Sequence, residues 1–244
     1  MCFLLKKMTF LRDSVFCVLM AVMASSQASE QQRFLDESLS HSETVQGKGY
    51  TCLLSPWLER VPDAAKQEMA GLKGREKEDG YSVLDVYRVK KVGDDAPLDL
   101  LFGSLEVSCL QGKAGDYPEL HEKDIKDADF IRLLGQKYKE QTLREWTVAR
   151  AAVPADGDRY SDPSRIMGFI RPHIEKVKGR YVLATGYFRS VPGMLAPVKV
   201  VQYAWYEGDR LYQVTQTCLE VKEAVWSVFF NQTMGSFQFD KGNK

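Results

Sequence analysis

Two segments in the first half of the chain alternate apolar and polar residues as β-strands do. The first covers residues 81–89. The second covers residues 101–109 and places Leu101, Leu105, Val107 and Cys109 on one face and polar residues on the other. Successive side chains of a strand point to opposite faces, so this pattern predicts strands of an antiparallel sheet that is covered on one side.

Residues 127–153 instead show the spacing of an amphipathic helix. Asp127 suits the N-cap position, and Pro154 ends the pattern. The apolar stripe consists of Ile131, Leu134, Tyr138, Thr142, Trp146, Ala149 and Val153. We expect this long helix to flank the sheet through its stripe. A shorter helix is predicted from Pro62 to Gly74.

Residues 170–188 predict a hairpin whose turn is centred on Lys178-Gly179. The expected cross-strand pairs are Ile174 with Leu183 and Ile170 with Tyr187. Pro172 has no backbone N–H to donate to a strand ladder. We therefore expect this strand to lie at an edge of the sheet or to carry a bulge.

A second hairpin contains the aromatic run YAWYEGDRLYQV, from Tyr203 to Val214. A primed turn at Gly208-Asp209 places Trp205 opposite Tyr212. One face of this hairpin then carries Val201, Tyr203, Trp205, Tyr212, Val214 and Cys218. These rings either fill a core or form an exposed platform.

The last element favours the core. Residues 221–239 are apolar on more than one side of a helix, through Val221, Val225, Trp226, Val228, Phe229, Phe230 and Met234. So much apolar surface has to be covered, and the aromatic face of the preceding hairpin is its nearest partner along the chain. The sequence therefore predicts an α+β fold, with a central antiparallel sheet built of hairpins and flanked by a long helix and an apolar C-terminal helix.

The first 28 residues have the features of a secretory signal peptide. A basic segment precedes the uncharged apolar stretch Val15–Ala24, and small residues up to Ala28 provide a cleavage site. We predict cleavage near Ala28 and a periplasmic or secreted location. A retained membrane anchor is the alternative, although the stretch is shorter than the ~20 residues of a membrane span. Cys17 lies inside the stretch, so no lipid anchor is expected.

The remaining chain has the length and charge of one exported domain. Residues 29–48 are polar and predict a mobile leader or a short docked helix, residues 49–240 a single globular domain, and residues 241–244 a tail. The full chain has 33 basic and 33 acidic residues; loss of the signal peptide removes three and one of them, which leaves a formal charge of −2. This balance, without Lys or Arg clusters, argues against a nucleic acid or an anionic membrane as partner.

The order of these elements resembles that of the PsbP-like family of extrinsic and periplasmic proteins. The resemblance extends from Tyr50 to Phe239 and includes a strand that ends at Thr217-Cys218 and a helix that closes with Ser236-Phe237. It implies a central antiparallel sheet flanked by helices, and a role as an accessory or assembly factor. The family has no shared catalytic motif that could be carried over to this chain.

Three cysteines, Cys52, Cys109 and Cys218, remain after signal cleavage. In an oxidising compartment they allow one disulfide, in three possible pairings, and one leftover thiol. Alternatively, all three are small buried residues. No cysteine has a histidine nearby in the sequence, so catalysis by a thiol is not expected.

Two acidic segments match metal sites only in part. DGDRYSD, with Asp156, Asp158 and Asp162, lacks the glycine and the final carboxylate of a calcium loop. HEKDIKD lacks a second histidine at helical spacing; its possible ligands are His121, Glu122, Asp124 and Asp127. We interpret the first as a solvated loop and the second as a charge cluster at a helix start, and expect no metal or other cofactor.

The sequence contains no nucleophile elbow, phosphate-binding loop or dinucleotide-binding glycine pattern. We therefore assign no catalytic residue and predict an exported, non-catalytic envelope protein that acts as an accessory or protein-binding domain. Met194 and Leu195, on a loop between Pro192 and Pro197, are candidate contacts for an envelope protein partner.

Two alternatives remain open. The first is a periplasmic protein that binds a small ligand or lipid around Trp205, Tyr212 and Trp226. The second is a hydrolase with an unrecognised site, which requires His121 or His173 to lie in a deep polar pocket. The sequence does not specify the oligomeric state.

Overall fold

The computed structural model describes residues 36, 39–63, 80–90, 103–151, 165–191 and 195–239. The chain forms two units, residues 1–42 and 43–244, and the fold below is that of the second. Several predictions lie outside the described residues: the signal peptide, most of the helix from Pro62 to Gly74, the loop with Asp156, Asp158 and Asp162, residue Met194, and the C-terminal tail.

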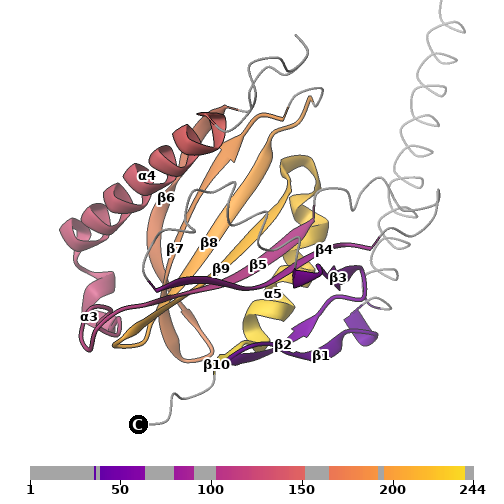
Figure 1. Cartoon of the computed structure of the whole chain (residues 1–244), viewed down its shortest axis with the longest axis horizontal. Coiled ribbons are helices and arrows are strands. Elements are labelled where there is room, and N and C mark those ends of the chain that lie inside the picture. Colours follow the sequence, from indigo (N-terminus) through magenta and orange to yellow (C-terminus); the bar gives the residue numbers. More distant parts are fainter. Residues whose placement is uncertain are drawn as a thin grey trace, which may run out of the picture. The chain divides into compact units, whose positions relative to one another are not determined.

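Two antiparallel sheets form the fold (Figure 1). The large sheet contains, in spatial order, β3 (Leu58–Arg60), β4 (Tyr81–Val89), β5 (Ser104–Gln111), β9 (Arg210–Leu219), β8 (Val198–Tyr206), β7 (Arg180–Arg189) and β6 (Ile166–Val177). The small sheet contains β1 (Glu43–Gln46), β2 (Tyr50–Leu54) and β10 (Gln238–Phe239), with β2 in the centre. Most neighbours in the large sheet are joined as hairpins, as the sequence predicts.

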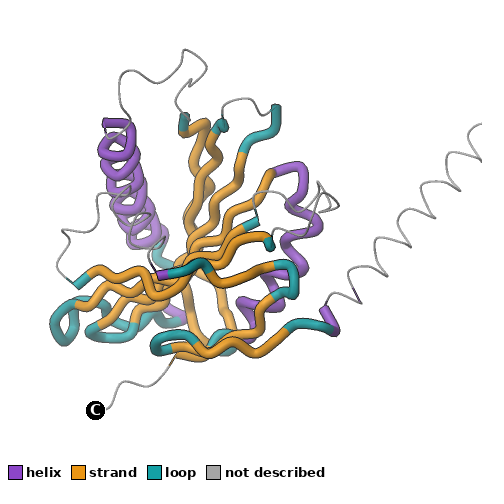
Figure 2. The backbone as a smooth tube through the Cα atoms, turned by 45° about the vertical axis from the view of Figure 1, so that its right-hand side comes forward, coloured by secondary structure: helices purple, strands orange, loops and turns teal. Residues whose placement is uncertain are grey.

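Helices cover both faces of the large sheet. The helical elements are α3 (Glu122–Ile125), α4 (Ala128–Ala151), the 3-10 helix η2 (Glu220–Lys222) and α5 (Glu223–Ser236). Figure 2 shows α4 and α5 on opposite sides of the large sheet. The predicted α+β class, with a long helix and an apolar C-terminal helix beside an antiparallel sheet, is confirmed. Among the described helices, none combines the length and the apolar character needed to cross a membrane.

The start of α4 agrees with its prediction. The backbone N–H of Phe130 donates a hydrogen bond of 2.8 Å to Oδ1 of Asp127, and the N–H of Ile131 donates to the Asp127 carbonyl. Asp127 is thus the N-cap residue, because its side chain satisfies one of the N–H groups that the first turn leaves free.

The two hairpins differ in how well their register follows from the turn. In β8–β9, Trp205 pairs with Tyr212 as predicted, and Gly208 has the positive φ of 79° that a primed turn requires. In β6–β7, Ile174 pairs with Leu183 as predicted, but Ile170 pairs with Gly186 and not with Tyr187. The register shifts between Ile170 and His173, around the proline of this edge strand.

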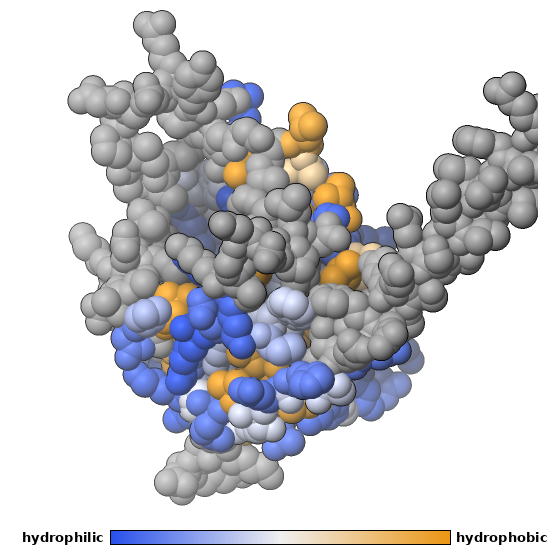
Figure 3. Space-filling view, turned by 90° about the vertical axis from the view of Figure 1, so that its right-hand side faces the viewer, coloured by the Kyte–Doolittle hydropathy of each residue, from blue (hydrophilic) through white to orange (hydrophobic). Residues whose placement is uncertain are grey.

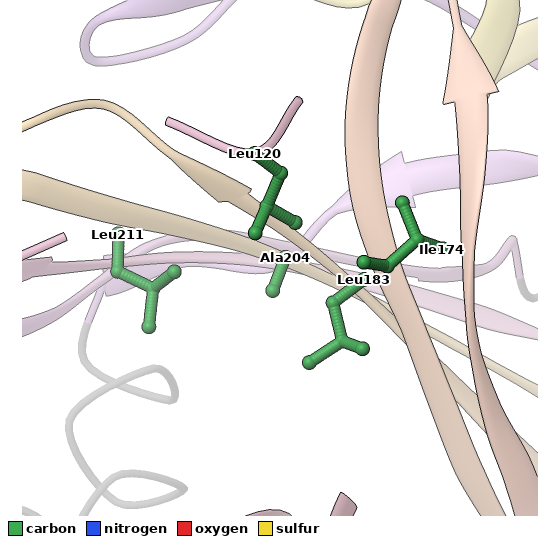
Figure 4. Packing of buried hydrophobic residues seen from close by; sticks show 5 residues of the cluster. All are labelled: Leu120, Ile174, Leu183, Ala204 and Leu211. Atoms are coloured by element: carbon green, nitrogen blue, oxygen red, sulfur yellow. The ribbon is translucent and has the colours of Figure 1, made fainter. Parts of the chain in front are cut away.

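The face of the large sheet that α4 covers holds an aliphatic cluster (Figure 4). Its buried members are Leu120, Ile174, Leu183, Ala204 and Leu211, and the half-buried side chains Phe130, Ile131 and Leu134 of α4 pack against it. A Cβ added to Gly135 of α4 would lie 2.3 Å from the Pro172 ring. The absence of a side chain at this position thus lets the helix approach β6 closely.

The opposite face holds an aromatic cluster. Trp205 and Tyr212 are only 3% and 4% exposed. The ring of Phe239 lies 5.2 Å from that of Trp205 and 4.2 Å from that of Tyr212, and the ring of Phe237 lies 6.1 Å from that of Trp205. These distances are within the range of favourable ring contacts. The rings of the β8–β9 hairpin therefore belong to the core, and the residues that follow α5 provide much of their cover.

Three details differ from the sequence predictions. Glu106 and Ser108 are buried, so β5 is covered on both faces and not on one, because it lies in the centre of a sheet with structure on both sides. Val221 is 66% exposed because α5 begins only at Glu223. Strand β1 lies within the predicted leader and is held by backbone pairing with β2, which an apolar pattern cannot reveal.

The close packing of α5 against the residue before β5 predicts one effect on stability. A Cβ at Gly103 would lie 1.8 Å from an atom of the Trp226 ring, which has no exposed surface. Gly103→Ala should therefore lower the free energy of unfolding by about 1–3 kcal/mol, measured by urea denaturation.

The matched control is Gly235→Ala in α5, where a Cβ meets no atom within 4 Å. This variant should be as stable as the wild type or more stable by up to ~1 kcal/mol, because alanine favours a helix over glycine. Equal stability of both variants would contradict the packing of Trp226 on Gly103.

Candidate functional site

The three aromatic residues proposed as a ligand site do not form one. The ring of Trp205 contacts the rings of Phe237 and Phe239, and the ring of Tyr212 contacts that of Phe239. Trp226 contacts Phe229 and Phe230 of its own helix, at ring distances of 5.9 and 5.2 Å. Since these rings are already packed against protein side chains, they stabilise the core and are not available to a ligand.

Both histidines proposed for a hydrolase site are exposed. His121 immediately precedes α3, and its backbone N–H donates to the carboxylate of Asp124. His173 lies on the edge strand β6, 3.7 Å from a carboxylate oxygen of Glu175. This exposure disagrees with the deep polar pocket that the hydrolase hypothesis requires at His121 or His173. Within the described residues, no cluster of His, Cys, Asp or Glu has an arrangement that could hold a metal ion.

The cysteines are free and buried in the structure. Burial, followed by the charge of Asp85, raises the pKa of Cys52 to about 12. Burial, followed by the charge of Glu223, raises that of Cys218 to about 11. Burial also raises the pKa of Cys109. All three thiols therefore stay protonated near neutral pH, which disfavours nucleophilic chemistry.

One buried charge joins the two sheets. The carboxylate of Asp85 has no exposed surface and accepts two hydrogen bonds of 2.5 Å from the guanidinium of Arg60. The hydroxyl of Tyr50 donates to the same carboxylate at 2.8 Å and lies 2.8 Å from the hydroxyl of Tyr87. Tyr50 belongs to the small sheet and Asp85 to the large one. We interpret this network as structural, because its buried charge is paired and hydrogen-bonded within the protein.

Large apolar side chains are exposed where four strands end together. Ile166, Arg189, Val198 and Leu219 are neighbours in one row across β6, β7, β8 and β9. Met167 follows this row and is 63% exposed, Leu195 precedes it and is fully exposed, and Val221 follows it and is 66% exposed. We call Met167, Leu195 and Val221 the end surface. Figure 3 shows apolar side chains reaching the surface at the upper end of the view.

A half-buried arginine, Arg189, belongs to the row of residues beside the end surface. Burial lowers the pKa of the Arg189 guanidinium, although a guanidinium remains protonated at neutral pH. Among the residues that the structure describes, no carboxylate forms an ion pair with Arg189. A partly buried cation of this kind is stabilised by any anion that reaches it.

A cavity lies between α5 and the large sheet. It is a cavity of about 250 Å³ lined by Lys199, Val201, Tyr203, Gln216, Cys218, Glu223, Ser227, Phe230 and Asn231. At this cavity, Nζ of Lys199 lies 2.5 Å from Oε1 of Glu223. The described lining contains the buried thiol of Cys218 and no histidine beside it.

Sequence reasoning found only part of these sites. Leu195 was recognised from its proline-bracketed loop, whereas Val221 was assigned to a buried helix face. Met167 and Gln216 gave no signal, since an isolated methionine or glutamine in a strand is ordinary. Met167 is distinguished only by its exposure and Gln216 only by its burial, and both depend on the fold.

The raised pKa of Cys218 predicts how stability depends on pH. Its ordinary value is 9.0, so between pH 9 and about 11 the unfolded chain releases a proton that the folded chain keeps. The stabilisation is therefore complete below pH 9 and is lost as the pH rises toward 11, by about 2–3 kcal/mol. Urea unfolding at pH 8, 9.5 and 11 measures this loss.

The variant Cys218→Ala separates this residue from the other titrating groups. Its stability should fall less steeply over the same pH range than that of the wild type. Parallel stability curves for the two proteins would show that the thiol titrates normally in the fold.

Comparison with known proteins gives likeness at the level of the fold. No family model matches the sequence, and no curated protein matches it. One similar solved structure is the solution structure of cyanobacterial PsbP (CyanoP) from Synechocystis sp. PCC 6803, at 14% identity and a TM-score of 0.45, covering 81% of this chain and 92% of that one. Another is the Ran-binding protein Mog1p of Saccharomyces cerevisiae, at 12% identity and a TM-score of 0.41, covering 82% of this chain and 95% of that one.

A third similar structure belongs to a protein of Bacteroides thetaiotaomicron VPI-5482, at 11% identity and a TM-score of 0.41. The match covers 80% of this chain but 47% of the other, so this chain spans about half of that protein's length. The expected resemblance to PsbP-like proteins is thus found among solved structures, and it concerns the fold alone.

Proposed function

We propose that this chain is an exported, non-catalytic domain that binds a protein partner at its end surface. The observation that carries the proposal is the exposure of three large apolar side chains, Met167, Leu195 and Val221, around one row of strand ends. Apolar groups gathered on the surface of a folded domain favour association, because contact with a partner removes them from water.

The end surface rests on a firm base. Beneath it lies a cluster of buried side chains, Val198, Val200 and Leu219, with Tyr187 and Val191 packed around them. The ring of Trp146 in α4 lies 6.5 Å from that of Tyr187, so the helix also supports this end of the sheet. Val198 and Leu219, which belong to the row of strand ends, thus join the end surface to the packed core.

Arg189 indicates the chemistry of the partner. Its side chain is half-buried, and burial lowers the pKa of the guanidinium, so part of the cost of removing it from water has already been met within the fold. A carboxylate placed beside an apolar side chain would pair with Arg189 while the apolar group covers Leu195 or Val221. We therefore propose that the partner presents an acidic residue next to an apolar one.

Charge substitutions at the end surface test partner binding. Leu195→Asp and Val221→Asp place a charge where the proposal requires an apolar contact, so each should reduce the recovery of the main cross-linked partner from an envelope fraction at least about tenfold. Quantitative mass spectrometry of the cross-linked products measures the recovery. The matched control is Leu133→Asp, because Leu133 is 49% exposed near the start of α4 and lies outside the end surface.

Equal recovery with all three variants and the wild type would refute the end surface as the interface. Arg189→Glu adds a check on the partner's charge: it should weaken the contact as strongly as Leu195→Asp. An unchanged contact with Arg189→Glu would remove the acidic residue from the proposal while leaving the apolar contact in place.

The export part of the proposal has its own test. Expressed in full in a Gram-negative host, the protein should appear in the periplasm with Ser29 or a close neighbour as its first residue, as measured by intact-mass spectrometry. Val18→Arg, which places a charge within the apolar stretch, should retain the full-length chain in the cytoplasm. Recovery of the uncleaved wild-type chain from the cytoplasm alone would contradict export.

A further inference from the structure

The cavity under α5 is built from two regular faces that meet. Lys199, Val201 and Tyr203 are alternate residues of β8, and Gln216 and Cys218 are alternate residues of β9, so all five lie on one face of the sheet. The opposite wall consists of Glu223, Ser227, Phe230 and Asn231, which recur at helical spacing on one side of α5. The cavity is therefore a property of the packed core and does not depend on a loop.

The side chain of Gln216 determines which polar group a ligand of this cavity must carry. The residue is 6% exposed, and its side-chain nitrogen Nε2 has no hydrogen-bond partner among the described residues. Its cross-strand neighbour in β8 is Val201, whose side chain has no polar atom to offer. A buried amide N–H without an acceptor is unfavourable, so the cavity is best filled by a group with an oxygen that can accept from Nε2.

The charges around the cavity cancel. The ammonium group of Lys199 and the carboxylate of Glu223 form an ion pair of 2.5 Å, which leaves no net charge to attract an ion. Burial, followed by the charges of Glu175 and Glu223, raises the pKa of Tyr203 to about 12, so this phenol is also neutral at physiological pH. An ionised ligand would give up its hydration without gaining a counter-charge, and a neutral ligand is therefore favoured.

The cavity is small and has apolar walls. A volume of about 250 Å³ corresponds to roughly eight water molecules at their share of liquid volume, ~30 Å³ each. The side chains of Val201 and Phe230 provide apolar walls on the sheet and the helix. The space thus suits a small molecule with a short apolar part and one polar end.

From these four observations we infer that the cavity between α5 and the β8–β9 face is a binding site for a small uncharged molecule whose carbonyl or amide oxygen accepts a hydrogen bond from Gln216. No residue that lines the cavity belongs to the end surface, and binding there does not depend on the protein partner proposed above.

Three probes with the same six-carbon chain and different end groups test the inference. Hexanamide is neutral and carries the required oxygen, hexanoate carries a charge, and hexylammonium carries a charge and no acceptor. Titration of the chain without its signal peptide, followed by two-dimensional NMR, should show hexanamide moving the Gln216 side-chain amide resonances downfield. Its affinity should exceed those of the other two probes at least tenfold, a difference of about 1.4 kcal/mol.

Variants connect the signal to the cavity. Gln216→Leu should weaken hexanamide binding at least tenfold, whereas Gln202→Leu should leave it unchanged, because Gln202 lies on the opposite face of β8 and donates to Thr215. Ser227→Phe should abolish binding by filling the cavity from the helix side. If Gln216→Leu does not fold, as judged by circular dichroism, the comparison of Ser227→Phe with Gln202→Leu decides.

Two outcomes would overturn the inference. One is the absence of saturable hexanamide binding, which would mean that water alone satisfies Gln216. The other is equal binding of hexanamide to the wild type and to Gln216→Leu, or tighter binding of a charged probe, which would show that the amide does not select the ligand. Loss of the protein partner in the cross-linking experiment would affect neither result.

Discussion

The large sheet has apolar side chains on both faces, and neither face can be left in water. Ala204 and Trp205 are consecutive in β8, Leu211 and Tyr212 are consecutive in β9, and all four are buried. Consecutive residues of a strand point to opposite faces, so the central strands require cover from two sides. The rest of the fold meets this requirement. The segment between β5 and β6 supplies α4 for one face, and the end of the chain returns with α5 and β10 to cover the other.

The two covers are attached in different ways. Helix α4 lies on the aliphatic cluster and approaches β6 most closely where glycine meets proline, at Gly135 and Pro172. Helix α5 is fixed at its C-terminal end, where the backbone N–H of Leu53 donates a 2.7 Å hydrogen bond to the Ser236 hydroxyl and aromatic rings follow. On the side of the helix that carries Glu223, Ser227 and Asn231, a cavity is left between α5 and the sheet, where the sheet residues include Val201 and Cys218.

The parts of the fold that were predicted correctly are those specified by residues close together in the sequence. A two-residue turn with glycine fixes the β8–β9 register, and a capping aspartate fixes the start of α4. The register of Ile170 did not follow from its turn, because the bulge around Pro172 adds a residue that counting from the turn cannot include. The burial of Glu106 and the exposure of Val221 depend on which elements pack together and where a helix begins. Gln216 and Met167 likewise depend on the packing of distant elements, because only their surroundings in the fold mark them as site residues.

The irregular edge strand β6 also limits how other chains can join this protein. An exposed strand ordinarily offers a row of free N–H and C=O groups that another strand can extend, either from a partner or from a second copy. Pro172 removes one donor from the middle of β6, and the shift beside it breaks the regular spacing of the remaining groups. At the other end of the sheet, β3 has only three residues. Growth of the large sheet from one molecule into the next is therefore disfavoured at both of its edges.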